Sequence, residues 1–217
     1  NREGWMTDPW GRNFLGTPPQ GRADYAFFQH ILQSLDKKTG RCAILFPHGV
    51  LFRKEESELR RKLVEADLID CVLGLGANLF YNSPMEACVV FCRSKKAPKR
   101  RGKVLLIDAV SEVARERAMS FLKPEHQARI AAAYAAYTDE TGFAKVATME
   151  EIAAQNFSLS IPLYVKRIGA GASAQEVDAP VTLRQAWDAW ESSGRAFWTQ
   201  MDEVVDMLDG LVGTAEE

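Results

Sequence analysis

The sequence predicts an α/β fold, and two observations support this class. Short apolar runs bounded by glycine, proline or charged residues recur at 41–47, 68–75, 86–93 and 104–109. Amphipathic helical patterns precede the first run and separate it from the second. Alternation of this kind is typical of a sheet covered by helices, with parallel strands where a helix intervenes.

The first half of the chain gives the clearest elements. Residues 1–22 are rich in glycine, proline, tryptophan and asparagine, which indicates a loop. Residues 23–39 carry aromatic and leucine side chains at helical spacing, and Gly40 is expected to stop that helix. A charged amphipathic helix follows at 53–67.

The strands at 68–75 and 86–93 are joined by about ten residues without a helical pattern. A parallel return needs a longer crossover, so these two strands are predicted to pair antiparallel.

The second half of the chain predicts two helices, a linker and a helical tail. A helix is expected over 116–137, around Pro124 at a first-turn position, and a smaller one is capped by Thr148 with Glu151. Residues 169–180 have linker composition, and 181–212 form one long helical pattern. The predicted domains are 1–110, a small α+β extension over 111–168, and a helical tail over 181–217.

Composition limits the class of protein. The net charge of −2 predicts no polyanion partner by itself, so local clusters must be judged separately. No C-x-x-C pair and no zinc-finger histidine spacing occurs, so no metal site is expected and the four cysteines are interpreted as reduced thiols. No apolar stretch approaches the ~18 residues of a membrane span, and no signal peptide is evident. A cytoplasmic protein without membrane contact is expected.

A series of motifs between residues 8 and 165 narrows the fold further. These are "DPWGRNFLGTPPQGRADYAFFQHIL", "GRCAILFPHGVLFRKEESELRRKLVEADLIDCVLGLGANLFYNSPMEACVVF", "GKVLLIDA" and "MEEIAAQNFSLSIPLYV". In this order they resemble the modification subunit of type I restriction–modification systems, an adenine-specific DNA methyltransferase. The resemblance implies a Rossmann-like sheet with an antiparallel last strand and S-adenosyl-L-methionine as methyl donor. It also implies double-stranded DNA and the specificity and restriction subunits as partners.

The sequence departs from that family in one respect. The glycine-containing cofactor loop and the Asn-Pro-Pro-Phe tetrapeptide, which the family carries upstream, are both absent. Residues 17–20, "TPPQ", lack the asparagine and the aromatic residue. Together with a start at Asn1, this suggests the carboxyl-terminal part of a catalytic domain, inactive alone, within a longer methyltransferase. The alternative hypothesis is a non-catalytic assembly or DNA-binding module of a multi-subunit complex.

An aromatic pair lies between the two strands of the expected hairpin. An enzyme that modifies a base in duplex DNA must extrude and hold that base, and a flat ring can stack on it. The resemblance places Phe80 first and Tyr81 second in this role. Alternatively, both rings pack on the edge of the sheet. Asn82 is interpreted as a turn residue.

Three further residues are candidates for a cofactor or base pocket. Asp24 and Tyr25 open the first helix, and Asp24 could equally be a helix cap. Pro47 ends a strand at its carboxyl edge, where open α/β sheets bind ligands. The neighbouring His48 is expected to be structural or to face a phosphate rather than to act as a base.

Two other segments suggest partners. The basic run over 93–103 could follow a phosphate backbone, or it could be a solvated loop that protects an edge strand. The tail carries much aromatic surface on a helical pattern, which suggests that it docks on a partner helix, or else folds back on its own domain. The candidate residues are Lys96, Lys99, Arg100 and Arg101 for DNA, and Trp187, Trp190 and Trp198 for the partner helix.

Overall fold

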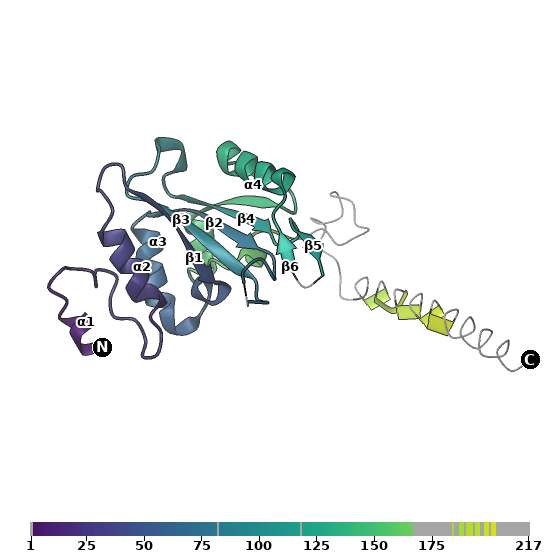
Figure 1. Ribbon diagram of the computed structural model, residues 1–217, viewed down its shortest axis with the longest axis horizontal. Coiled ribbons are helices and arrows are strands. Elements are labelled where there is room, and N and C mark those ends of the chain that lie inside the picture. Colours follow the sequence, from purple (N-terminus) through teal and green to yellow (C-terminus); the bar gives the residue numbers. More distant parts are fainter. Residues whose placement is uncertain are drawn as a thin grey trace, which may run out of the picture. The chain divides into compact units, whose positions relative to one another are not determined.

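A computed structural model describes residues 2–81, 83–117 and 119–166, together with twelve residues of the tail between 184 and 202. The chain divides into two compact units, Asn1–Gly171 and Ala172–Glu217, which are described separately. The fold of the first unit is mixed α/β, as the sequence predicts (Figure 1).

The centre of the first unit is a five-stranded sheet. Its order is β1 (Arg41–Pro47), β3 (Ala87–Arg93), β2 (Ile69–Leu75), β4 (Lys103–Ala109) and β7 (Ala144–Thr148). Strand β3 runs antiparallel to both neighbours, β2 and β4 are parallel, and β7 is antiparallel to β4. The predicted antiparallel pairing of the two strands around residues 76–86 is confirmed. Strands β1 and β2 point the same way but do not touch, because β3 is inserted between them.

Helices cover both faces of this sheet. Helices α2 (Asp24–Gln33), α3 (Ser57–Glu65) and α5 (Met149–Ala154) pack on one face in a cluster that includes buried Phe28. Helix α4 (Pro124–Ala136) packs on the other face (Figure 1). All seven residues of β2 are buried, because helices lie on both sides of this central strand.

Short elements complete the unit. They are α1 (Arg2–Met6), the two-stranded hairpin of β5 (Ala114–Glu116) and β6 (Met119–Phe121), and the 3-10 turns η1 (His48–Leu51), η2 (Lys54–Glu56), η3 (Pro98–Arg100) and η4 (Ile161–Leu163).

Three of these boundaries differ from the sequence-based prediction. Helix α1 occupies part of the expected loop over 1–22, and α2 ends at Gln33, well before Gly40. The hairpin β5–β6 replaces the first residues of the helix expected over 116–137. That helix begins only at Pro124, since a residue that precedes proline is disfavoured in helical conformation. The capping box of Thr148 and Glu151 at α5 is found as predicted.

The expected extension over 111–168 shares the central sheet, because its strand β7 pairs with β4. Residues 1–110 and 111–168 therefore lie within one compact unit. The described residues of the tail are helical. No helix among the described residues is long and apolar enough to cross a membrane.

Strand β1 forms one edge of the sheet. Within the described residues it pairs with β3 only, so its other side presents backbone N–H and C=O groups without a strand partner. Leu45 on this strand is 48% exposed.

Candidate functional site

Three strands deliver their carboxyl ends to the same edge of the sheet. Strands β1, β2 and β4 run in one direction and end at Pro47, Leu75 and Ala109. Open α/β sheets bind ligands at this edge, where the loops after the strands meet. We call this side the carboxyl edge.

The loop over 76–86 leaves the carboxyl edge between β2 and β3 and carries the aromatic pair. Phe80 is half-buried and packs against the core cluster on the α4 face. The N–H of Ser83 donates to the carbonyl of Phe80 at 3.1 Å, which closes a turn. Tyr81 follows Phe80 and is 88% exposed. Asn82 lies outside the described residues.

The end of β1 is fixed to the start of β3. His48 lies 2.8 Å through Nε2 from the carbonyl oxygen of Ala87. A carbonyl only accepts, so His48 donates from Nε2 and holds Pro47 beside the base of the aromatic loop. This contact assigns His48 a structural role, in agreement with the sequence-based interpretation.

Asp24 and Tyr25 both connect α2 to η1, the turn after β1. The Asp24 carboxylate accepts from Arg53 at 2.7 Å, and Arg53 packs closely on Gly49 of η1. Tyr25 is 2% exposed and donates its hydroxyl to the carbonyl of Val50 at 3.1 Å, and burial raises its pKa. The N-cap of α2 is Ala23 rather than Asp24. Asp24 thus starts the helix and reaches the carboxyl edge through an ion pair.

Arg53 joins a second carboxylate to this corner. Glu56 is fully buried and lies 3.5 Å from the Arg53 guanidinium. Burial raises the pKa of Glu56, while the positive charge of Arg53 lowers it and the nearby Asp24 raises it further. The hydrogen bond that Arg53 donates to Asp24 in turn raises the pKa of Arg53. The Arg53 guanidinium is therefore shared by the carboxylates of Asp24 and Glu56. Its positive charge offsets part of the negative charge of this corner.

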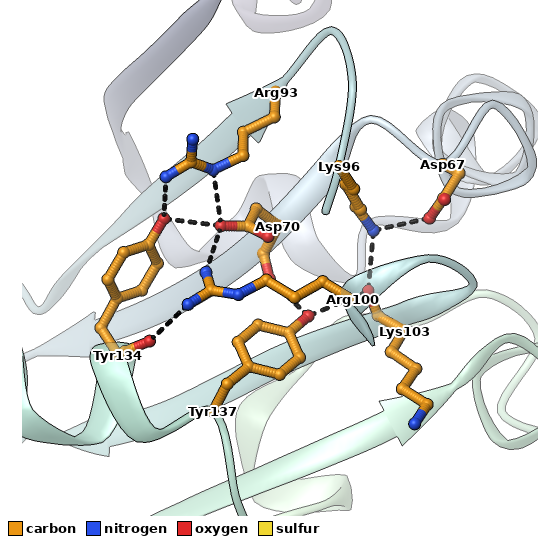
Figure 2. A network of polar contacts seen from close by, with 8 residues as sticks. All are labelled: Asp67, Asp70, Arg93, Lys96, Arg100, Lys103, Tyr134 and Tyr137. Carbon is orange, nitrogen blue, oxygen red and sulfur yellow. Dashed lines mark hydrogen bonds and ion pairs between the residues drawn. The ribbon is translucent and has the colours of Figure 1, made fainter. Parts of the chain in front are cut away.

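The basic run over 93–103 lies at the opposite end of the sheet, between the end of β3 and the start of β4. Figure 2 shows the hydrogen bonds and ion pairs that its charged side chains make. The Lys96 ammonium is buried and contacts Asp67 at 2.6 Å and the carbonyl of Lys103 at 2.7 Å. Among the residues expected to contact DNA, Lys99 and Arg101 remain exposed, but Lys96 is neutralised inside the fold.

Arg100 is likewise used inside the fold. Its guanidinium donates to Asp70 at 2.9 Å and to the carbonyl of Tyr134 at 3.0 Å, and it lies over the rings of Tyr134 and Tyr137 (Figure 2). Asp70 is fully buried and also accepts from Arg93 at 3.1 Å and from the Tyr134 hydroxyl at 2.6 Å. Two arginines and Tyr134 thus join the basic run, β2, β3 and α4 around one carboxylate, and the ring of Tyr137 lies against Arg100.

The tail contains the three tryptophans of the expected partner helix. Trp187, Trp190 and Trp198 are 59%, 67% and 65% exposed, and the rings of the first two lie 5.1 Å apart. The expected docking surface is therefore solvent-exposed aromatic area on a helix.

Sequence reasoning did not identify several residues that organise these regions. Arg53 looked like one more charge on an amphipathic helix, and Asp70 lay unremarked inside an apolar run. Arg117 of the β5–β6 hairpin was assigned to the helix expected over 116–137, and Arg115 just before it was assigned no role. A charged residue inside an apolar strand is the one signal that could have pointed to Asp70 beforehand.

The sheet, with a reversed strand between two parallel ones, is of the Rossmann-like type that type I methyltransferases share. A crystal structure of the type I restriction–modification methyltransferase subunit from Streptococcus thermophilus shares this fold. Its TM-score is 0.71 at 34% identity, over 76% of this chain and 35% of that one. The family described as N-6 DNA Methylase matches residues 2–170. The chain belongs to this family.

Curated relatives agree with the family. The chain is 30% identical over 202 residues to the type I restriction enzyme MjaVIII methylase subunit of Methanocaldococcus jannaschii, covering 91% of this chain and 33% of the relative. It is 34% identical over 172 residues to the HindI methylase subunit of Haemophilus influenzae, covering 75% and 37%. The chain thus spans about a third of the length of these relatives.

A methyltransferase family implies a methyl donor, but the described residues do not complete a site for S-adenosyl-L-methionine. Asp24 is already paired with Arg53, and Tyr25 is buried with its hydroxyl on Val50. A groove of about 1030 Å³ lies at the start of the chain, and its lining includes neither of these side chains nor Pro47.

Proposed function

We propose that this chain is the carboxyl-terminal part of the catalytic region of a type I modification subunit. The complete enzyme transfers a methyl group from S-adenosyl-L-methionine to N6 of an adenine that is extruded from double-stranded DNA. The chain contributes the wall of the base pocket at the carboxyl edge, and the remaining parts of the site come from other segments of the enzyme. Family membership supports the reaction class.

One observation carries the assignment of the base-holding role. Tyr81 is an exposed aromatic ring at the carboxyl edge, on the loop between β2 and the reversed strand β3. An aromatic side chain exposed to this degree buries little apolar area in the fold, whereas stacking on an unpaired base is worth about 1–3 kcal/mol. Phe80 packs on the core and supports the loop. The exposure therefore favours Tyr81 as the stacking ring and Phe80 as its anchor.

The test compares two variants in the complete methylase subunit assembled with its specificity subunit. Tyr81→Ala should lower the rate of N6-methyladenine formation by about 10- to 100-fold, the equivalent of the lost stacking energy, with unchanged thermal stability. Phe80→Ala should lower both the rate and the melting temperature, because it removes a partly buried ring. Mass spectrometry of digested DNA measures the product.

Two controls complete this experiment. Tyr81→Phe keeps a flat ring and should retain most of the rate. Met85, which is 62% exposed on the same loop, can be changed to alanine with little effect. Wild-type rates in Tyr81→Ala, or equal losses of rate and stability in that variant, would exclude a stacking role for Tyr81.

The partner surface of the tail is part of the same proposal. The exposed rings of Trp187, Trp190 and Trp198 fit a helix–helix interface with the specificity subunit. Substitution of all three by serine should weaken co-purification of that subunit while the melting temperature of the sheet unit stays unchanged. Retained co-purification would favour the alternative, in which the tail packs on its own subunit.

A further inference from the structure

The β5–β6 hairpin lies at the same edge of the sheet as the aromatic loop. It follows β4, whose carboxyl end neighbours that of β2. The backbone N–H of Ser120 in β6 donates to the carbonyl of Asn78 at 2.9 Å, and Asn78 lies three residues before Tyr81. Ser120 is buried by this contact. The hairpin is therefore fixed to the base of the loop that carries the exposed ring.

The register of the hairpin determines where its charges lie. Arg115 is directly opposite Ser120, and residues opposite each other in an antiparallel pair share one face. Arg115 and Ser120 therefore lie on one face of the hairpin, and the backbone of Ser120 is bonded to the aromatic loop at Asn78. Glu116 lies opposite Met119 on the other face, so its charge is turned away from Arg115. Arg117 follows at the tip with a left-handed φ of 54°.

These two arginines differ from most others in the first unit. Arg53, Arg60 and Arg100 are all held by internal hydrogen bonds or ion pairs. Arg115 and Arg117 are exposed, and neither guanidinium has a hydrogen bond or an ion pair with any residue that the structure describes. A planar guanidinium with its donors free fits two oxygens of a phosphate.

We propose that the β5–β6 hairpin holds the DNA backbone beside the extruded base, with Arg115 and Arg117 on phosphates that flank it. This inference rests on the proposed function, since it needs the aromatic loop to face DNA. The phosphate contacts then lie at the carboxyl edge and not on the basic run, where Lys96 is paired with Asp67 and Arg100 with Asp70. The two ends of the sheet are separated by the length of β3, about 20 Å for seven residues.

This separation offers a matched experiment. Arg115→Gln with Arg117→Gln removes two exposed charges at the carboxyl edge, and Lys99→Gln with Arg101→Gln removes two exposed charges at the opposite end. Both double variants are made in the assembled methylase, and dissociation constants for a duplex that the wild type methylates are measured by fluorescence anisotropy between about 50 and 200 mM salt.

The hairpin variant should make the slope of log K against log salt shallower by about 1.8, which corresponds to two lost phosphate contacts. The basic-run variant should keep the wild-type slope. Arg115→Lys with Arg117→Lys keeps both charges and should keep most of the slope, but it should weaken affinity because the bidentate geometry is lost. Melting temperatures equal to wild type show that each variant is folded.

Other outcomes would overturn the inference. A wild-type slope in the hairpin double variant, or a shallower slope only in the basic-run variant, excludes the hairpin as a phosphate contact. An assembly that binds DNA but forms no N6-methyladenine contradicts the proposed function, while the slopes on a random-sequence duplex still decide for or against the hairpin.

Discussion

At the scale of single residues, Asp70 connects three side chains that are remote from it in the sequence. Its carboxylate is fully buried and one oxygen accepts from Arg93, Arg100 and Tyr134. Its other oxygen is buried without a hydrogen-bond partner in the structure. Burial and then the hydrogen bond to Asp70 raise the pKa of Tyr134. The network holds the basic run against the sheet.

Replacement of this carboxylate tests the network. Asp70→Asn leaves two neighbouring arginines without their shared counter-charge, and removal of one partner from a buried ion pair costs about 3 kcal/mol. The free energy of unfolding of this chain in urea, monitored by circular dichroism, should fall by about that amount. The matched control is Asp139→Asn, which breaks the exposed pair with Lys145 and should cost less than about 1 kcal/mol. Equal losses in the two variants would contradict the assignment.

At the scale of elements, local patterns predict what local forces determine. The four apolar runs became β1 to β4 because each is buried or half-buried by the neighbouring layers. The capping box at Thr148 is likewise encoded within four residues. Residues 116–121 of the hairpin were predicted as helix because short segments fit either period, and the position of the hairpin depends on a contact with Asn78, which is remote in sequence.

Helix α5 provides a prediction at this scale. The Thr148 hydroxyl accepts from the N–H of Glu151 at 3.3 Å, and the Glu151 carboxylate accepts from the N–H of Thr148 at 2.7 Å. Thr148→Ala removes the cap and should lower the free energy of unfolding by about 1 kcal/mol, measured by urea denaturation. Thr141→Ala, at an exposed position without a cap, should change it by less than about 0.5 kcal/mol. A neutral Thr148→Ala would show that α5 is held by Ile152 and its packing alone.

The sequence predicted only part of the candidate site, because the rest depends on contacts between residues that are remote in the sequence. The sequence located the aromatic loop, since two rings among polar residues between strands form a local pattern. It could not distinguish exposed Tyr81 from half-buried Phe80, because that depends on the α4 face. It also could not show that Asp67 would neutralise Lys96, a pair separated by 29 residues.

At the scale of the whole molecule, the chain spans about a third of its curated relatives. The pocket residues it supplies are paired or buried, so the chain alone should bind S-adenosyl-L-methionine no more tightly than about 1 mM, or about 4 kcal/mol. Isothermal titration calorimetry on this chain measures the affinity, with the complete methylase subunit as the positive control. Micromolar binding by the chain alone would show that its residues form the cofactor site.

The open side of β1 has a consequence for handling the isolated chain. Alternate residues of β1 (Arg41–Pro47) present a row of backbone donors and acceptors on that side, while the residues between them bond to β3. An extended polypeptide can form backbone hydrogen bonds with such an edge, and the same strand of a second copy is one example. We therefore expect copies of the isolated chain to associate through β1, and the associated fraction to increase with protein concentration, as long as no other segment pairs with this edge.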